Sequence, residues 1–331
     1  MRIKNHIIKI ILIADFIVLV FAGLNFSILM KKAGLPPEYL AKINSFSFDV
    51  NNINKGQTIL EFDNKIIDKP GLLDFYLLYH KQNDIVRIKS IQNSSTIERT
   101  LALPLKLDMT ELMIMAIVTL FYFFTGIYIL LTFKSTAFSY VLHMVTIATA
   151  VMVMFDWGNF VIYPMAINFI LFLLFDISIF LVPTLFLHFS FLYPRTESRY
   201  KMLLLGPFYI ASITFISISF INLFKIFFLG INVNNTNYLA FHTYISDMFL
   251  VAGLILTVAK LEHSALTISN VLARKKIYWA LLGISFGPLV YVFLRLMPRL
   301  ILGYELVSQS FLNFTIIIAP IMLLISVTRK N

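Results

Sequence analysis

The strongest constraint on the fold of this chain is a series of long apolar runs. Runs of about 20 apolar residues are long enough to cross the hydrocarbon core of a bilayer as helices. The apolar runs cover residues 8–30, 110–133, 138–155, 168–192, 202–224, 241–261, 277–297 and 305–327. The chain has 59% hydrophobic residues, whereas a soluble globular domain has about 45–50%. The sequence therefore predicts an all-α membrane bundle of about eight transmembrane helices.

Basic residues are distributed unequally between the two ends of these runs. With the N-terminus inside, the short inner segments hold Arg2, Lys4, Lys9, Lys134, Arg195, Arg199, Lys201, Lys260, Arg274, Lys275, Lys276, Arg329 and Lys330. The short outer segments hold only Lys225, Arg295 and Arg299. The positive-inside rule then places both termini in the cytoplasm, and it does not apply to a loop as long as 31–108. We therefore expect a multi-pass protein of the bacterial cytoplasmic membrane with residues 31–108 outside the cell.

Residues 1–30 are interpreted as a cytoplasmic N-terminus followed by a signal-anchor helix. The segment begins with basic residues, and its apolar stretch continues to Met30. That stretch is longer than the 7–15 residues, roughly, of a cleavable signal peptide. A removed signal peptide remains the alternative, because Val20-Phe21-Ala22 loosely resembles a cleavage site.

Residues 31–108 are predicted to form a small extracytoplasmic α+β domain. The composition shifts there to Asn, Lys, Asp and Ser, and alternating or helical apolar spacing recurs between turn residues. In chain order we expect a strand at 58–62, a turn at 63–65, a short strand at 66–67, a helix at 72–80 and strands at 85–91 and 96–105. The chain has no cysteine, so this domain must be stable without disulfides and cannot use thiol chemistry.

Two stretches of this domain resemble a bacterial PDZ domain. They are NKGQTILEFDNKIID at 54–68 and NDIVRIKSIQNSSTIERTLAL at 83–103, with the predicted helix between them. PDZ domains bind a peptide by adding it as a strand beside the helix. The resemblance thus implies either an extracellular peptide or ligand site, whose face is not identified, or a degenerate domain that only caps the bundle.

A second resemblance covers residues 109–331, which we interpret as a seven-helix membrane sensor domain. LHFSFLYPRTES at 187–198, RKKIYWALLGISFGPLVYVFLRLMP at 274–298 and APIMLLISVTRKN at 319–331 resemble helix segments of bacterial membrane sensor regions. An anchor helix, a PDZ-like outer domain and seven further helices are the input layout of competence-type quorum-sensing histidine kinases. The resemblance implies signal transduction in a two-component system.

The sequence contains no catalytic motif to match that layout. It shows no phosphoacceptor helix, no Gly-rich ATP lid and no GxxxxGK[ST], so we expect no enzyme activity and no cofactor. The chain is interpreted as a signal-sensing receptor, either separate from its output protein or shortened from a longer ancestor. Expected partners are membrane lipid, a cytoplasmic output protein or a second copy, and an extracellular peptide or lipophilic ligand. Nucleic acid is not expected, because the basic residues lie at helix ends, where they contact anionic lipid.

The alternative is a transporter or an intramembrane enzyme that uses ionisable residues at membrane depth. Such residues are functional by default, and His143, Asp176 and Asp247 are the deepest, with Asp15 in the first run. One interpretation is a polar pocket that joins His143, Asp176 and Asp247 around a cation, a proton or a polar ligand. The other is a set of interhelical hydrogen bonds that only fix packing. The histidines lack metal-ligand spacing, so a metal site is not expected.

Two further segments carry both a functional and a structural interpretation. His188, Tyr193, Pro194 and Arg195 lie at the predicted cytoplasmic mouth, where they form either a coupling element or a helix stop. GISFG at 283–287 offers small residues at a spacing that suits close packing, either within the chain or against a second copy.

Overall fold

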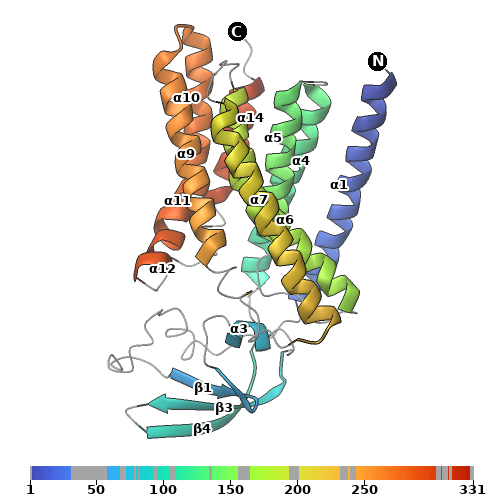
Figure 1. Ribbon diagram of the computed structural model, residues 1–331, viewed down its shortest axis with the longest axis vertical. Coiled ribbons are helices and arrows are strands. Elements are labelled where there is room, and N and C mark those ends of the chain that lie inside the picture. Colours follow the sequence, from blue (N-terminus) through green and yellow to red (C-terminus); the bar gives the residue numbers. More distant parts are fainter. Residues whose placement is uncertain are drawn as a thin grey trace.

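The computed structural model describes residues 2–30, 58–67, 72–77, 80, 82–92, 95–104, 109–133, 136–155, 165–193, 201–231, 238, 244–302, 307, 312 and 315–328. These residues form a bundle of long helices with a small β-sheet at one end (Figure 1). The start of the first helix and the end of the last described helix both lie at the end of the bundle away from the sheet. The sequence prediction of a helical membrane bundle with a small mixed domain is confirmed at this level.

Seven described helices are apolar and long enough to cross a membrane. They are α1 (Arg2–Leu29), α4 (Met109–Thr132), α5 (Ala137–Phe155), α6 (Met165–Leu192), α7 (Lys201–Phe228), α9 (Ser246–Thr267) and α10 (Val271–Phe286) with its continuations. After α10 the chain continues through α11 (Pro288–Tyr291), a π-helical turn (Val292–Leu296) and α12 (Met297–Leu302). The eighth predicted span is described as α14 (Ile318–Thr328), which has 11 residues, while most of 303–314 lies outside the described residues.

Helix α10 begins at Val271, earlier than the predicted start at 277. The side chain of Asn270 caps this end, because its Oδ1 accepts hydrogen bonds from the backbone N–H groups of Leu272 at 2.9 Å and Ala273 at 3.1 Å. Asparagine is among the best N-cap residues, since its oxygen satisfies donors that have no partner inside the helix. The basic run 274–276 therefore lies in the opening turns of a helix.

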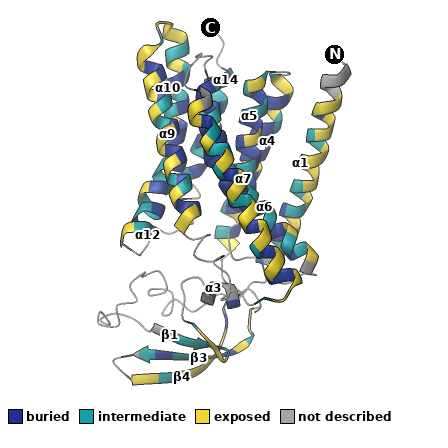
Figure 2. Cartoon of the chain, viewed as in Figure 1, coloured by how far each residue is buried: buried dark blue, intermediate teal, exposed yellow. Residues whose placement is uncertain are grey.

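Helix α6 is the central helix of the bundle. It packs against α5, α7 and α9. In its most apolar stretch 72% of the residues are buried inside the protein, whereas the figure is 17% for α1 and for α7. The exposed side chains of α1 and α7 are mostly large and apolar, and Figure 2 marks many positions along both helices as exposed. In a membrane these faces contact lipid, so the interior is organised around α6.

Helices α6 and α9 approach each other closely at Pro183 and Gly253. A Cβ atom added to Gly253 would collide with the Pro183 side chain and lie 3.0 Å from its Cα. Small residues let membrane helices approach closely, and dispersion contacts then replace the hydrophobic drive that lipid cannot provide. Gly253 is therefore required for the α6–α9 distance.

The glycines of GISFG pack inside the chain. A Cβ on Gly283 would lie 2.8 Å from Cβ of Met322, and a Cβ on Gly287 would lie 3.1 Å from Cβ of Ala319. Both contacts join α10 to α14, and they favour the interpretation of this segment as an internal packing surface.

The sheet is antiparallel, with strand order β2-β1-β3-β4. The strands are β1 (Thr58–Phe62), β2 (Lys65–Ile66), β3 (Ile85–Gln92) and β4 (Ser95–Ala102), and α3 (Leu72–Leu77) lies between β2 and β3. Asp63 and Asn64 have positive φ values of 47° and 63°, as a two-residue hairpin turn requires. The four predicted strands are confirmed, whereas the helix is shorter than 72–80.

The sheet and the bundle share one cluster of buried apolar side chains. Phe62 and Val86 of the sheet belong to the same cluster as Phe155 of α5 and Phe172 of α6. Tyr238, which is fully buried, belongs to it as well. The small domain is thus joined to this end of the bundle through a continuous set of buried apolar side chains.

Gly253→Ala should destabilise the protein, because the added methyl group collides with Pro183. Overpacking of this kind costs about 1–3 kcal/mol. Gly206→Ala in α7 is the matched control: nothing lies within 4 Å of its added Cβ, and Ala favours a helix over Gly by about 0.5–1 kcal/mol. Thermal unfolding in detergent should show a lower midpoint for Gly253→Ala alone. Equal midpoints for the two variants would contradict the close packing.

Ser95→Cys and Ser269→Cys should react with a membrane-impermeant maleimide from opposite sides of the membrane. Ser95 begins β4, whereas Ser269 lies between α9 and α10 at the far end of the bundle, and both are exposed. The chain contains no native cysteine, so each variant reports a single position. Intact cells should label Ser95→Cys, and only permeabilised cells should label Ser269→Cys. Labelling of both variants in intact cells would contradict the orientation.

Candidate functional site

His143, one of the three predicted pocket residues, is paired with Asp15. Its Nε2 lies 3.3 Å from Asp15 Oδ2, and their side chains are 1% and 7% exposed. This pair joins α5 to α1 near the middle of the apolar stretch of α1. The two atoms lie within ion-pair distance, but among the described residues neither forms a hydrogen bond of good geometry. Their pairing lowers the cost of two ionisable side chains at this depth, since a lone ionised group in hydrocarbon is costly.

The contact of α1 with the bundle includes a second polar link. Asn25 is fully buried, and its Nδ2 donates a hydrogen bond to the backbone oxygen of Met154 at 2.7 Å. The other ring nitrogen of His143, Nδ1, lies close to Gly126 of α4: a Cβ atom added to this glycine would be 3.3 Å from it. Asp15 and Asn25 therefore hold a largely lipid-exposed helix on α5 by polar contacts.

Asp176 lies elsewhere, in the half of α6 nearer the sheet. It is fully buried, and the hydroxyl of Tyr238 points to both its oxygens, with distances of 3.2 and 3.4 Å. Asp247 is buried in the first turn of α9. Since α6 and α9 run in the same direction (Figure 1) and meet at Pro183 and Gly253, the register brings Asp176 and Asp247 to the same level. The structure does not bring His143 to them, because it lies in the half of α5 nearer the termini.

Tyr193 connects three helices at the end of the bundle that carries the termini. Its hydroxyl donates a hydrogen bond to the backbone oxygen of Ser326 in α14 at 2.8 Å, and Ser326 Oγ donates to the backbone oxygen of Lys276 in α10 at 2.7 Å. Burial raises the pKa of Tyr193 to about 12, although the hydrogen bond with Ser326 opposes this shift. The phenol therefore stays neutral and keeps its proton for donation.

The other residues of the predicted cytoplasmic mouth are placed in part. His188 Nδ1 lies 2.7 Å from the hydroxyl of Tyr209, so it links α6 to α7. Pro194 and Arg195 lie outside the described residues. Of the predicted coupling residues, Tyr193 has the geometry of a connector, and His188 has that of a packing contact.

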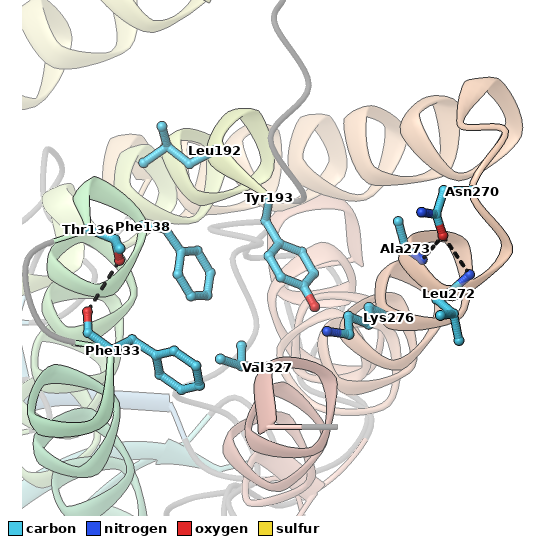
Figure 3. A pocket seen from close by; sticks show the side chains of 10 residues that line it. All are labelled: Phe133, Thr136, Phe138, Leu192, Tyr193, Asn270, Leu272, Ala273, Lys276 and Val327. Atoms are coloured by element: carbon cyan, nitrogen blue, oxygen red, sulfur yellow. Dashed lines mark hydrogen bonds between the residues drawn. The ribbon is translucent and has the colours of Figure 1, made fainter. Parts of the chain in front are cut away.

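A pocket of about 460 Å³ opens beside Tyr193. This volume lies within the range of about 300–1,000 Å³ that is typical of small-molecule sites. Its apolar wall is made by Phe133, Phe138, Leu192, Tyr193, Leu272 and Val327, with Ala273 between them. Three polar side chains, Thr136, Asn270 and Lys276, complete the described lining. Figure 3 shows the Lys276 amine pointing toward the space between Tyr193 and Val327.

Each wall of the pocket comes from the end of a helix. Phe133 follows α4, Phe138 opens α5, Tyr193 follows α6, Lys276 lies in the opening turns of α10 and Val327 closes α14. The sequence reasoning found Tyr193 but missed the pocket. An aromatic residue beside several predicted span ends was the available signal, yet only the packing of five helices shows that these ends meet.

No family model, curated protein or solved structure matches this chain. The geometry above is therefore the ground for any functional proposal, together with the resemblances drawn from the sequence.

Tyr193→Phe should destabilise the protein, because it removes the hydrogen bond that the Tyr193 hydroxyl donates to the backbone oxygen of Ser326. That oxygen then lacks one of its donors. Loss of such a bond costs about 0.5–1.5 kcal/mol. Tyr278→Phe is the matched control, since Tyr278 lies in α10 and its side chain is 47% exposed. Thermal unfolding in detergent should show a lower midpoint for Tyr193→Phe only. An unchanged midpoint would mean that Tyr193 does not hold the three helices together.

Proposed function

We propose that this chain is a membrane-embedded receptor module that passes a signal to a cytoplasmic output protein. In this proposal the sheet domain, taken as PDZ-like, faces the cell exterior, and both termini face the cytoplasm. The resemblance to the input region of quorum-sensing histidine kinases supports the proposal, as does the asymmetry of Lys and Arg along the sequence.

The observation that carries the proposal is the position of α6. Near the sheet, its Asp176 accepts from Tyr238, a residue that belongs to the cluster shared with the sheet. At the opposite end, Tyr193 directly follows α6 and is bonded to Ser326 of α14, the last described helix. One largely buried helix thus carries a polar contact with Tyr238 in its sheet-side half, and the residue that follows its far end is bonded to the last described helix. A shift of α6 changes both contacts together. A receptor needs such an element, whose movement affects two distant sites at once.

Tyr238→Phe should change the reactivity of a cysteine placed at Thr328, the last residue of α14. The substitution removes the hydroxyl that donates to Asp176 and keeps the ring, so it perturbs α6 at the sheet end only. The readout is the maleimide labelling rate of Thr328→Cys in reconstituted vesicles, and a change of about threefold or more corresponds to a shift of about 0.6 kcal/mol.

Tyr128→Phe is the control for that experiment. Tyr128 lies on α4 and is 48% exposed, so its hydroxyl should not affect α14. Equal labelling rates for Tyr238→Phe and Tyr128→Phe would contradict transmission along α6.

A proton- or cation-coupled carrier is the second function, and the full burial of Asp176 favours it. The two proposals differ in what Asp176→Asn does. In a receptor, Asn keeps an oxygen that accepts from Tyr238, so folding and the Thr328→Cys labelling rate should stay near those of the parent. Asp176→Leu should instead lower the yield of folded protein, because it removes the carboxylate that accepts from the buried Tyr238 hydroxyl, and loss of such an acceptor costs about 1–3 kcal/mol.

The measurement is proton uptake into vesicles loaded with a pH-sensitive dye, alongside size-exclusion chromatography of each variant. If the parent protein takes up protons and a well-folded Asp176→Asn variant does not, the result would favour the carrier and count against the receptor.

A further inference from the structure

We propose that the pocket beside Tyr193 binds an anionic amphiphile, with the acidic headgroup at Lys276 and the apolar chain against Phe138 and Val327. This inference names the ligand class of the proposed receptor, so its role as a signal rests on that function. Binding itself rests on the geometry of the pocket alone.

The pocket is apolar on most of its surface and carries one formal charge in its described lining. Phe133, Phe138 and Val327 provide flat and branched apolar contacts. Lys276 is the charged residue of the lining that the structure describes, and it is half-buried. Sites for small molecules commonly combine an apolar lining with a few placed polar groups. An elongated apolar group with one acidic end matches this arrangement.

The Lys276 amine is available to a ligand. Over the described part of the chain it forms no ion pair, and no Asp or Glu is among the described lining residues. Its neighbour Arg274 differs, because a guanidinium nitrogen of Arg274 donates to the backbone oxygen of Ile268 at 2.7 Å. A half-buried amine with no acidic partner attracts an anion more strongly than a solvated one, since the lower dielectric strengthens the Coulomb interaction.

The position of the pocket fits an amphiphile in depth. Its walls are formed where α4, α6 and α14 end and where α5 and α10 begin, which is the level of the lipid headgroups for helices that cross the hydrocarbon core. A basic side chain at this level attracts anionic lipid. The acidic amphiphile is either a phospholipid of the bilayer or a free fatty acid, and both present the same chemistry to Lys276.

The test uses the full chain in nanodiscs of phosphatidylcholine, with two photoreactive probes. One is a diazirine fatty acid and the other is a phosphatidylglycerol with a diazirine in its acyl chain. Cross-linked residues are mapped by mass spectrometry, and an uncharged methyl ester of the fatty-acid probe measures the contribution of the acidic group. We expect labelling of pocket residues such as Phe138 and Leu192 by at least one acidic probe, and on the order of tenfold less by the ester.

Three variants locate the site. Lys276→Gln should reduce labelling of the pocket by the acidic probe on the order of tenfold, because it removes the charge and keeps a polar side chain. Lys275→Gln is the matched control, since Lys275 is adjacent and exposed and does not line the pocket; its labelling should stay within about twofold. Ala273→Phe should abolish labelling by filling the pocket from one wall, whatever the fate of Lys276→Gln.

The outcomes are decisive for the ligand class. Labelling by the phospholipid probe alone assigns a lipid of the bilayer, labelling by the fatty acid alone assigns a free amphiphile, and both support the proposal. Where the fatty acid labels the pocket, equal labelling by its ester would overturn the proposal. Equal effects of Lys276→Gln and Lys275→Gln, or labelling by both acidic probes only outside the pocket, would also overturn it. If the probes label the pocket but Tyr238→Phe does not change the labelling rate of Thr328→Cys, the proposed receptor function is contradicted and the binding site is supported. If labelling fails while that coupling holds, only the ligand class is overturned.

Discussion

The arrangement of this bundle depends on how closely α6 can approach α9. Lipid surrounds the protein, so helices are held together by contact and by internal polar bonds instead of by exclusion from water. Gly253 lets α9 rest on the backbone of Pro183, and α5 and α7 pack on the remaining faces of α6. Because most of α6 is buried, Asp176 in its sheet-side half and Tyr193 just beyond its far end must find partners inside the protein. The two polar contacts that define the proposed signal path follow from that packing.

Most of the fold could be predicted from the sequence, because its two signals are local. Apolar runs of membrane length predicted the long helices, and alternation with a turn at 63–65 predicted the strands and their order of appearance. The ends of helices were less accurate, since a cap such as Asn270 extends a helix into a polar stretch. The internal packing of GISFG needed the position of α14, because small residues at this spacing suit a partner in the same chain or in another.

The site could be predicted only in part. Depth along a helix singled out His143 and Asp176, but it carries no information on which face of each helix meets which neighbour. Hence the sequence grouped the two residues, while the structure gives His143 to Asp15 and Asp176 to Tyr238. Tyr238 follows no local pattern, since it lies outside the long helices and is buried only by tertiary packing. The pocket depends likewise on the meeting of five helix ends.

The contact between Asp15 and His143 has a consequence for the synthesis of the protein. Helix α1 enters the membrane long before α5 has been made, so Asp15 must cross into lipid with its partner still untranslated. A carboxyl at the centre of a helix opposes insertion by about 2.5–3.5 kcal/mol, and isoleucine, leucine, phenylalanine and valine each favour it by about 0.3–0.6 kcal/mol. The exposed isoleucines and phenylalanine of α1 therefore do more than contact lipid in the finished protein. They hold the helix in the bilayer during the interval before His143 arrives, and docking of α1 onto α5 is then a late step of assembly.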